Sequence, residues 1–437
     1  MKLLAVVSAL SVLLAVQHGA LAAYCHGKPD PKAQPNLNPI FTDAPVFVKS
    51  VEHGKLFTVG DGEDRINVVH VWGTPYQWGE AQGQLLQKEA QGLISELWSY
   101  LELQVEQGVN GTIRLPEEVL KIIADVGLDG ALDLTWEATK KYSGEYFFQE
   151  MQGLADAAGV EYKKIRRIHM IGELTKGSCS MYGAWGAATA GGSTLQLRAL
   201  DWDVDGPFKD FPQITVYHTG NGDQGSDFIN IGWTGWVGSI TGLNSHRMAI
   251  SEIGVSFPDD TFGKESRFGV PFTFLLRDIL QFDRSLNDSI THLTDAKRTC
   301  NLILGVGDGK ESAFRGVRYS GSNIAFFDDK NLEPEADWHP RIENVVYYGM
   351  DWLCPGYSEV LARQIKAHHG NITAENTIRD IVPITQTGNL HIAVYDLSNS
   401  VFYVANARAS YETGKAMAYD RTFNRLNATK LFDEPHP

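Results

Sequence analysis

The stretch that most constrains the fold runs from Gly177 to Asp203, with the sequence GSCSMYGAWGAATAGGSTLQLRALDWD. It begins with a cysteine among small residues and passes through the turn signal Ala190-Gly191-Gly192-Ser193. It then returns as an alternating segment that carries Arg198 and Asp201. Two such segments on either side of a glycine-rich turn predict a β-hairpin. Pairing of its strands would bring Arg198 and Asp201 beside Cys179.

A thiol with a guanidinium and a carboxylate nearby is a candidate nucleophile, because neighbouring charges control how readily a thiol ionises. The residues alone leave two other interpretations open. Cys179 could be a buried, inert cysteine or part of a disulfide. Arg198 and Asp201 could form a simple ion pair.

The pattern Cys179-Ser-x-x-x-Ala184, followed by Leu197-Arg198-x-x-Asp201-Trp-Asp, resembles the nucleophile hairpin of N-terminal-nucleophile (Ntn) hydrolases. The resemblance is to the isopenicillin N acyltransferase family, and more distantly to acid ceramidases and bile-salt hydrolases. Gly73-x-Pro-Tyr, Gly242-Leu-Asn-Ser and Gly269-Val-Pro follow in the order of that family's elements. The resemblance implies an α+β fold, a four-layer αββα sandwich preceded by a mainly helical N-terminal segment.

The same resemblance implies a mechanism. The Ser178–Cys179 bond would be cleaved autocatalytically, leaving an α/β heterodimer in which Cys179 begins the second chain. The freed α-amine, with a pKa near 7.7–8, could take the thiol proton. Asp201 would hold the α-ammonium, and Arg198 would fix Asp201 and stabilise the thiolate. The substrate would be a small-molecule or lipid-like N-acyl amide whose acyl group is hydrolysed or transferred, with no cofactor.

The expected oxyanion donor departs from the family pattern. A side-chain amide is expected on the segment Asn344–Met350, but Gly349 stands at its position and Asn344 is displaced. Asn244, in the Gly-Leu-Asn-Ser turn, is a further candidate for contact with substrate. Loss of one oxyanion donor typically costs about 10²–10³ in rate. A catalytically inactive secreted binding protein of the same fold therefore remains an alternative.

The N-terminus reads as a secretory signal peptide. A basic start precedes the apolar run Leu3–Val16 and the small-residue signal Ala20-Leu21-Ala22. The apolar run is too short for a transmembrane span, and no other stretch predicts one. The expected organisation is a signal peptide over 1–22, a mainly helical α-chain segment over 23–178, and an Ntn-hydrolase β-chain over 179–437. The chain is thus expected to be secreted or lysosomal.

The sequons and cysteines fit an oxidising compartment. Four Asn-x-Ser/Thr triplets predict glycosylation, at Asn110, Asn287, Asn371 and Asn427. Four cysteines would remain in the mature chain, at positions 25, 179, 300 and 354. If Cys179 is a free nucleophile, one internal bridge can form, and we expect it between Cys300 and Cys354, with Cys25 in an extended leader.

Composition and spacing exclude several classes of function. The net charge of −15 without a basic block argues against nucleic acid as a partner. No cluster of histidine, cysteine and carboxylate residues has zinc-site spacing, so no metal is expected. A papain-like protease is a rival, because Gly177-Ser-Cys179 is similar to that family's nucleophile motif and His391 could serve as the base. Ser180 stands where that motif has an aromatic residue.

The helical and strand patterns fall on either side of Cys179. Helical spacing predominates before it and alternating strands follow it. Helices are expected over 76–106, 116–126, 131–141, 145–158, 162–174, 271–282, 286–293, 358–368 and 374–381. Strands are expected over 65–72, 213–218, 228–233, 248–252, 301–306, 312–319, 390–395 and 401–405.

Overall fold

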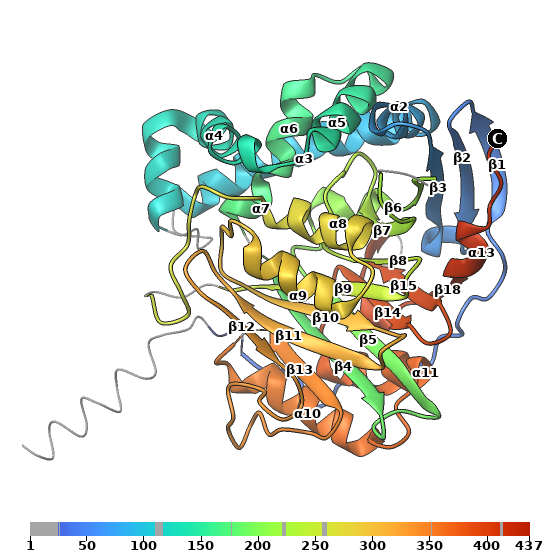
Figure 1. The fold of residues 1–437 in the computed structure, drawn as a ribbon, viewed down its shortest axis with the longest axis vertical. Coiled ribbons are helices and arrows are strands. Elements are labelled where there is room, and N and C mark those ends of the chain that lie inside the picture. Colours follow the sequence, from blue (N-terminus) through green and yellow to red (C-terminus); the bar gives the residue numbers. More distant parts are fainter. Residues whose placement is uncertain are drawn as a thin grey trace, which may run out of the picture.

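Two β-sheets lie face to face in the computed structural model of the chain (Figure 1). The structure describes residues 25, 27–109, 117–175, 177–220, 224–255, 260–350, 352–410 and 414–437. The signal peptide expected over 1–22 and the sequon at Asn110 lie outside these residues.

The larger sheet has ten strands. In spatial order they are β1 (Val46–Val51), β2 (Gly54–Val59), β3 (Ile66–Trp72), β6 (Pro212–His218), β7 (Phe228–Trp233), β8 (Gly242–Asn244), β9 (Met248–Gly254), β10 (Leu302–Asp308), β11 (Ala313–Tyr319) and β12 (Ile324–Phe327). All neighbours are antiparallel except β3 and β6, which pair in parallel. Because β3 pairs with β6, the segment before Cys179 contributes three strands to this sheet as well as its helices.

The smaller sheet has six strands and carries the Cys179 hairpin at its centre. In spatial order they are β13 (Val345–Met350), β4 (Ser178–Gly186), β5 (Gly192–Asp201), β14 (His391–Asp396), β15 (Val401–Asn406) and β18 (Asn424–Asn427). A separate short ribbon is formed by β16 (Arg408–Ser410) and β17 (Gly414–Ala416).

Helices cover the outer faces of both sheets and complete four layers, α, β, β and α (Figure 1). On the ten-stranded sheet lie α8 (Phe272–Phe282) and α9 (Leu286–Asp295). On the six-stranded sheet lie α10 (Pro355–His368), α11 (Ala374–Asn376) and α12 (Val382–Thr385), and α13 (Ala428–Phe432) ends the fold. The expected αββα sandwich is therefore confirmed.

The helices that precede Cys179 gather at one end of the molecule, where α2 packs against β1–β3 and α7 contacts α8 (Figure 1). They are α2 (Pro75–Leu85), α3 (Gln87–Val109), α4 (Glu117–Thr139), α5 (Glu145–Ala158), α6 (Tyr162–His169) and α7 (Ile171–Leu174). Thr74 starts α2 with a capping box that satisfies otherwise orphaned backbone donors. Gly79 of α2 and Gly153 of α5 let the two helices touch, since a Cβ at either position would come within 2.0 Å of a facing carbonyl oxygen.

The expected Cys300–Cys354 disulfide is wrong. Cys354 bonds to Cys25, with the two Cα atoms 5.3 Å apart. Cys300 forms no disulfide and is buried in the core under α8 and α9, whereas Cys354 precedes α10 on the other side of the sandwich. The two sheets that separate these cysteines prevent them from pairing, and Cys25 is tied down rather than part of a loose leader. Among the described residues, no helix has the length and apolar character needed to cross a bilayer.

Candidate active site

Cys179 is the second residue of β4 and lies on the inner face of the six-stranded sheet. The hairpin register sets Cys179 opposite Leu200, Met181 opposite Arg198, and Ser178 opposite Asp201. Directly opposed residues in an antiparallel pair point to the same face. Cys179 and Arg198 therefore share the buried face between the sheets, as the predicted hairpin requires.

The thiol is completely buried in the intact chain. Burial raises the pKa of Cys179 far above the usual thiol range, whereas the Arg198 guanidinium acts in the opposite direction. The carboxylates of Glu252 and Asp201 raise it further. Cys179 is thus a neutral thiol in this state. Its ionisation needs either a nearby base or exposure of the buried thiol to solvent.

Arg198 is held by a buried carboxylate on the facing sheet. Its Nη2 lies 3.1 Å from an oxygen of Glu252 in β9, and its Nε donates to the carbonyl of Ile240 at 3.3 Å. Its Nη1 has no hydrogen-bond partner among the described residues. Glu252 is therefore a site residue that the sequence analysis missed, since no local motif marks a glutamate in the middle of an apolar strand.

Asp201 lies on the other face of the hairpin, where the turn before β14 surrounds its carboxylate. The backbone N–H groups of Gly388 and Asn389 donate to it at 2.9 and 3.0 Å, and the Thr387 hydroxyl donates at 2.8 Å. Burial nevertheless raises the pKa of Asp201 to about 6, although these hydrogen bonds lower it. The Thr387 hydroxyl also lies 2.6 Å from Ser180 Oγ.

The three candidate oxyanion residues are not gathered around the thiol. Gly349 lies opposite Ser180, one position from Cys179, but its N–H donates to Ser358 Oγ. Asn344 precedes Val345, which pairs with Ala184 at the far end of β4. Its side-chain oxygen accepts from the backbone of Ala187.

Asn244 is also remote, at the end of β8. Its amide donates to the carbonyls of Leu280 and Asp283, and its oxygen accepts from the N–H groups of His246 and Met248. These bonds hold the turn into β9. From Met248 at its start, β9 extends six residues further to Gly254, whose N–H donates to the carbonyl of Gly177 beside the site. At about 3.3 Å per residue, Asn244 lies on the order of 20 Å from the thiol.

His391 does not form a catalytic pair with Cys179. The two residues lie in one row across the sheet, but Leu200 stands between them, so the strands are about 10 Å apart. Its Nδ1 lies 2.8 Å from Asn406 Oδ1, and burial lowers its pKa to about 3. This arrangement contradicts the papain-like alternative.

No metal-binding group of three or more histidine, cysteine or carboxylate residues occurs in the part of the chain that the structure describes. The sequons can be placed in part. Asn287 and Asn371 are exposed, whereas Asn427 is half-buried and caps α13 by accepting the Lys430 N–H at 2.9 Å.

Among known proteins, the chain is similar to two proteins of Dictyostelium discoideum. The chain is 34% identical to protein dcd1A of Dictyostelium discoideum over 440 residues, covering 97% of this chain and 98% of that protein. It is 33% identical to protein dcd1B of the same organism over 413 residues, covering 91% and 81%. No family model matches the chain.

Among solved structures, the chain is similar to a Caenorhabditis elegans N-acylethanolamine-hydrolyzing acid amidase ortholog, with 13% identity and a TM-score of 0.38 over 50% of this chain and 93% of that one. It is also similar to penicillin V acylase from Agrobacterium tumefaciens, with 12% identity and a TM-score of 0.39 over 58% and 87%.

Proposed function

The chain belongs to the family of the Dictyostelium proteins dcd1A and dcd1B, and we propose that it is an autoprocessing cysteine amidohydrolase that cleaves an N-acyl amide. Cys179 is the proposed nucleophile. Arg198 and Asp201 are the proposed groups that stabilise and orient it. If a second amine instead of water accepts the acyl group, the same reaction becomes an acyl transfer.

One observation carries the proposal. The hairpin register sets the Ser178–Cys179 peptide bond opposite Leu200 and Asp201, with the thiol on one face of the sheet and the Asp201 carboxylate on the other. On the thiol's face, the Arg198–Glu252 pair supplies the nearest fixed charges. The peptide bond before the cysteine thus lies between a nucleophile and a carboxylate suited to hold the amine that cleavage would release.

In the proposed maturation, Cys179 Sγ attacks the carbonyl carbon of Ser178. The bond from that carbon to the Cys179 nitrogen breaks, the nitrogen takes up the thiol proton, and a thioester forms. Water then hydrolyses the thioester, giving a carboxylate on Ser178 and a free thiol on Cys179. The new α-amine remains beside Asp201, which would hold it as an ammonium ion.

In the proposed mature enzyme, the α-amine of Cys179 removes the thiol proton and the thiolate attacks the acyl carbonyl. The amine product leaves with that proton, and water or a second amine releases the acyl group from the thioester. Arg198 would stabilise the thiolate against the opposing charges of Glu252 and Asp201. Because the thiol is buried in the intact chain, substrate access requires the chain end created by cleavage to move away.

The Cys25–Cys354 disulfide would join the two chains after cleavage. Cys25 belongs to the segment before Ser178 and Cys354 to the segment after it. A mature protein of this kind would migrate as one species without reductant and as two with it. The disulfide and the sequons also support the proposal that the chain is secreted or lysosomal and glycosylated, which glycosidase treatment of the secreted protein would test.

A second candidate function is a binding protein that keeps the fold without activity. It is favoured by one observation: Asn244 and Asn344 lie away from the thiol, and the N–H of Gly349 donates to Ser358 Oγ. In that case neither cleavage nor amide hydrolysis would occur.

The test is release of amine from a panel of N-acyl amides by the secreted protein, followed by mass spectrometry. Cys179→Ala should abolish release. Cys300→Ala is the matched control, because Cys300 is also a buried cysteine outside any disulfide but lies in the other layer of the core. Equal release by the wild type and Cys179→Ala would contradict the proposal.

A further inference from the structure

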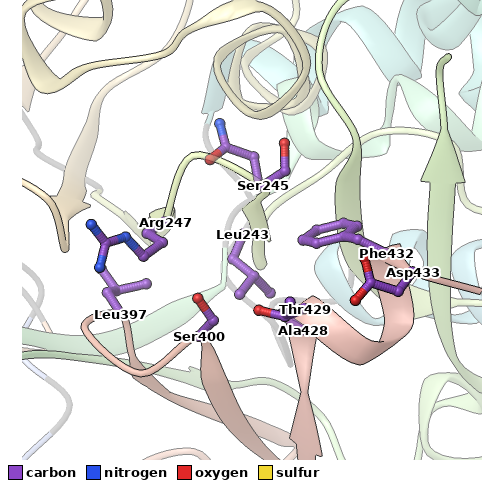
Figure 2. Close-up of a pocket in the computed structure, with 10 residues that line it drawn as sticks. Leu243, Ser245, Arg247, Leu397, Ser400, Ala428, Thr429, Phe432 and Asp433 are labelled. Atoms are coloured by element: carbon purple, nitrogen blue, oxygen red, sulfur yellow. The ribbon is translucent and has the colours of Figure 1, made fainter. Parts of the chain in front are cut away.

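A cavity of about 210 Å³ opens between α13 and the turns of two hairpins (Figure 2). One turn joins β8 to β9 and the other joins β14 to β15. Leu243, Leu397 and Phe432 contribute apolar side chains to its lining, and Ser245, Ser400 and Thr429 contribute hydroxyl groups. At about 30 Å³ per water, the space would hold about seven waters, or a small organic molecule.

Two residues that line this cavity have strained backbones. Arg247 has φ 58° and Ser400 has φ 53°, in the left-handed region that favours glycine or asparagine. Each stands at the end of a hairpin turn, where glycine would fit without strain. Non-glycine residues in this region cluster at functional sites, where the side chain justifies the strain. Here both side chains line the same cavity.

The cavity is also lined by two opposite charges, the Arg247 guanidinium and the Asp433 carboxylate, which do not form an ion pair with each other. Arg247 lies on one side and Asp433 on the opposite side (Figure 2). The Arg247 side chain makes one long hydrogen bond, from Nη1 to the Ser398 carbonyl at 3.3 Å. Neither residue forms an ion pair with any described residue, so both charges are available to a ligand.

The wall formed by α13 is fixed in place. Asn427 caps the start of the helix, and Glu434, directly after the cavity-lining Asp433, pairs with Lys55 of β2 at 2.7 Å. The Lys55 ammonium also donates to the carbonyl of Pro435 at 2.6 Å. These contacts hold Asp433 at a defined position relative to Arg247, so the cavity is formed before any ligand arrives.

We propose that this cavity binds a small zwitterion with an apolar body, such as a free amino acid or a short peptide. The ligand's carboxylate would pair with Arg247, its ammonium with Asp433, and its apolar part with Leu243 and Phe432. The cavity adjoins Asn244, about 20 Å along β9 from Cys179, and the inference does not rest on the proposed amidase activity.

The test is ligand-detected NMR titration of the full-length secreted protein with four probes. L-leucine and glycyl-L-leucine are zwitterions, and they distinguish an amino acid from a peptide. N-acetyl-glycyl-L-leucine lacks the ammonium, and glycyl-L-leucinamide lacks the carboxylate. We expect saturable binding of at least one zwitterion and at least about tenfold weaker binding of both singly charged analogues.

The variants Arg247→Asn and Asp433→Asn should each weaken binding of the zwitterion by at least about tenfold. Asparagine tolerates the left-handed backbone, so Arg247→Asn should fold, with a melting temperature equal to or above that of the wild type. Arg315→Gln is the matched control, because Arg315 also donates to a nearby backbone carbonyl but lies on β11, outside the cavity.

Binding that Arg247→Asn leaves unchanged would overturn the inference, as would failure of the wild type to bind either zwitterion at 10 mM, roughly the weakest useful affinity for a ligand of this size. A lower melting temperature for Arg247→Asn would show that the arginine serves the fold instead. Activity of Cys179→Ala is irrelevant to each outcome, so this inference and the proposed function can fail separately.

Discussion

Among the described residues, two buried arginine–glutamate pairs differ in their surroundings. Arg198 pairs with Glu252 at 3.1 Å beside Cys179, between the two sheets. Arg277 pairs with Glu150 at 2.6 Å between α8 and α5, and both side chains are fully buried. Burial and pairing alone therefore do not distinguish a site from a structural contact, because both pairs have them.

The neighbours of each pair make the distinction. Glu150 accepts hydrogen bonds from Tyr217 and Gln82, and the Arg277 guanidinium lies within 6.0 Å of four aromatic ring centroids. Both guanidinium groups have a buried nitrogen without a hydrogen-bond partner among the described residues, Nη1 in Arg198 and Nε in Arg277. Arg198 differs in lying beside a thiol, whose pKa its charge lowers. A pair enclosed by aromatic rings stabilises a fold, whereas a pair beside a nucleophile is available for chemistry.

The Arg277–Glu150 pair also joins the two sides of the proposed cleavage point, since Glu150 precedes Cys179 and Arg277 follows it. It would hold the two chains together after cleavage.

The largest expected effect is a loss of stability on breaking the Arg277–Glu150 pair. Arg277→Ala leaves Glu150 as a buried unpaired carboxylate and should lower the free energy of unfolding by about 3–5 kcal/mol. Chemical denaturation measures it. The control is Lys140→Ala, which removes an exposed partner of Glu137 and should change stability by less than about 1 kcal/mol. Equal losses in the two variants would remove the distinction between buried and exposed pairs.

The next effect separates the two pairs by function. Replacing a whole buried pair by apolar residues of similar size is often tolerated by the fold. Arg198→Met with Glu252→Leu should therefore fold but slow self-cleavage by about 10²–10³-fold, as expected when electrostatic stabilisation of a reacting group is lost. Arg277→Met with Glu150→Leu should cleave at the wild-type rate. The cleaved fraction over time, followed by gel electrophoresis with reductant, measures both. Similar rates for the two double variants would contradict the assignment.

A smaller effect should appear in the pH dependence of stability. The pKa of Asp201 is about 6 in the folded protein against 3.8 for an ordinary aspartate, so the folded state binds more protons between these values. Stability contributed by this group is therefore present below about pH 4 and is lost as the pH rises to about 6, by about 3 kcal/mol in total. Because cleavage would place an ammonium ion beside Asp201, the slope is measured in uncleaved Cys179→Ala, by denaturation at pH 4 and pH 7, and adding Asp201→Asn should remove it. A slope that Asp201→Asn leaves unchanged would show that burial does not shift this carboxyl group.

The smallest effect is expected at the remote oxyanion candidate. Asn344 directly precedes β13, at the end of that strand far from Cys179, and has φ 56°, which glycine accepts. Asn344→Gly should leave the self-cleavage rate unchanged and alter stability by less than about 1 kcal/mol, since one exposed hydrogen bond to Ala187 is lost and strain is relieved. A tenfold slower cleavage would show that Asn344 contributes to the cleavage reaction.

Much of the fold follows from periodicity and turn signals in the sequence. The helix expected over 145–158 and the strands around Cys179 form where the pattern predicts them. The helix expected over 76–106 is two helices, because the chain leaves helical geometry at Leu86, where no proline or glycine marks the break. The strands β1 and β2 were not predicted, since the residues of β1 are largely exposed and show no buried alternation.

The candidate site likewise contains residues that the sequence pattern predicts and residues that it does not. Residues within the hairpin could be found, because the register of two adjacent strands follows from their turn. Glu252 and Thr387 reach the site only through the packing of distant segments, which no local pattern encodes. The disulfide partner of Cys354 was missed for the same reason, since Cys25 lies 329 residues away in the sequence.

The most direct test of the account is N-terminal sequencing and intact mass of the secreted protein, with and without reductant, for the wild type and Cys179→Ala. The account predicts that the reduced wild type gives two chains, one beginning at Cys179, that remain joined through Cys25 and Cys354 when unreduced. Cys179→Ala should give a single chain in both conditions. A single uncleaved wild-type chain, or cleavage that persists in Cys179→Ala, would contradict the proposed nucleophile.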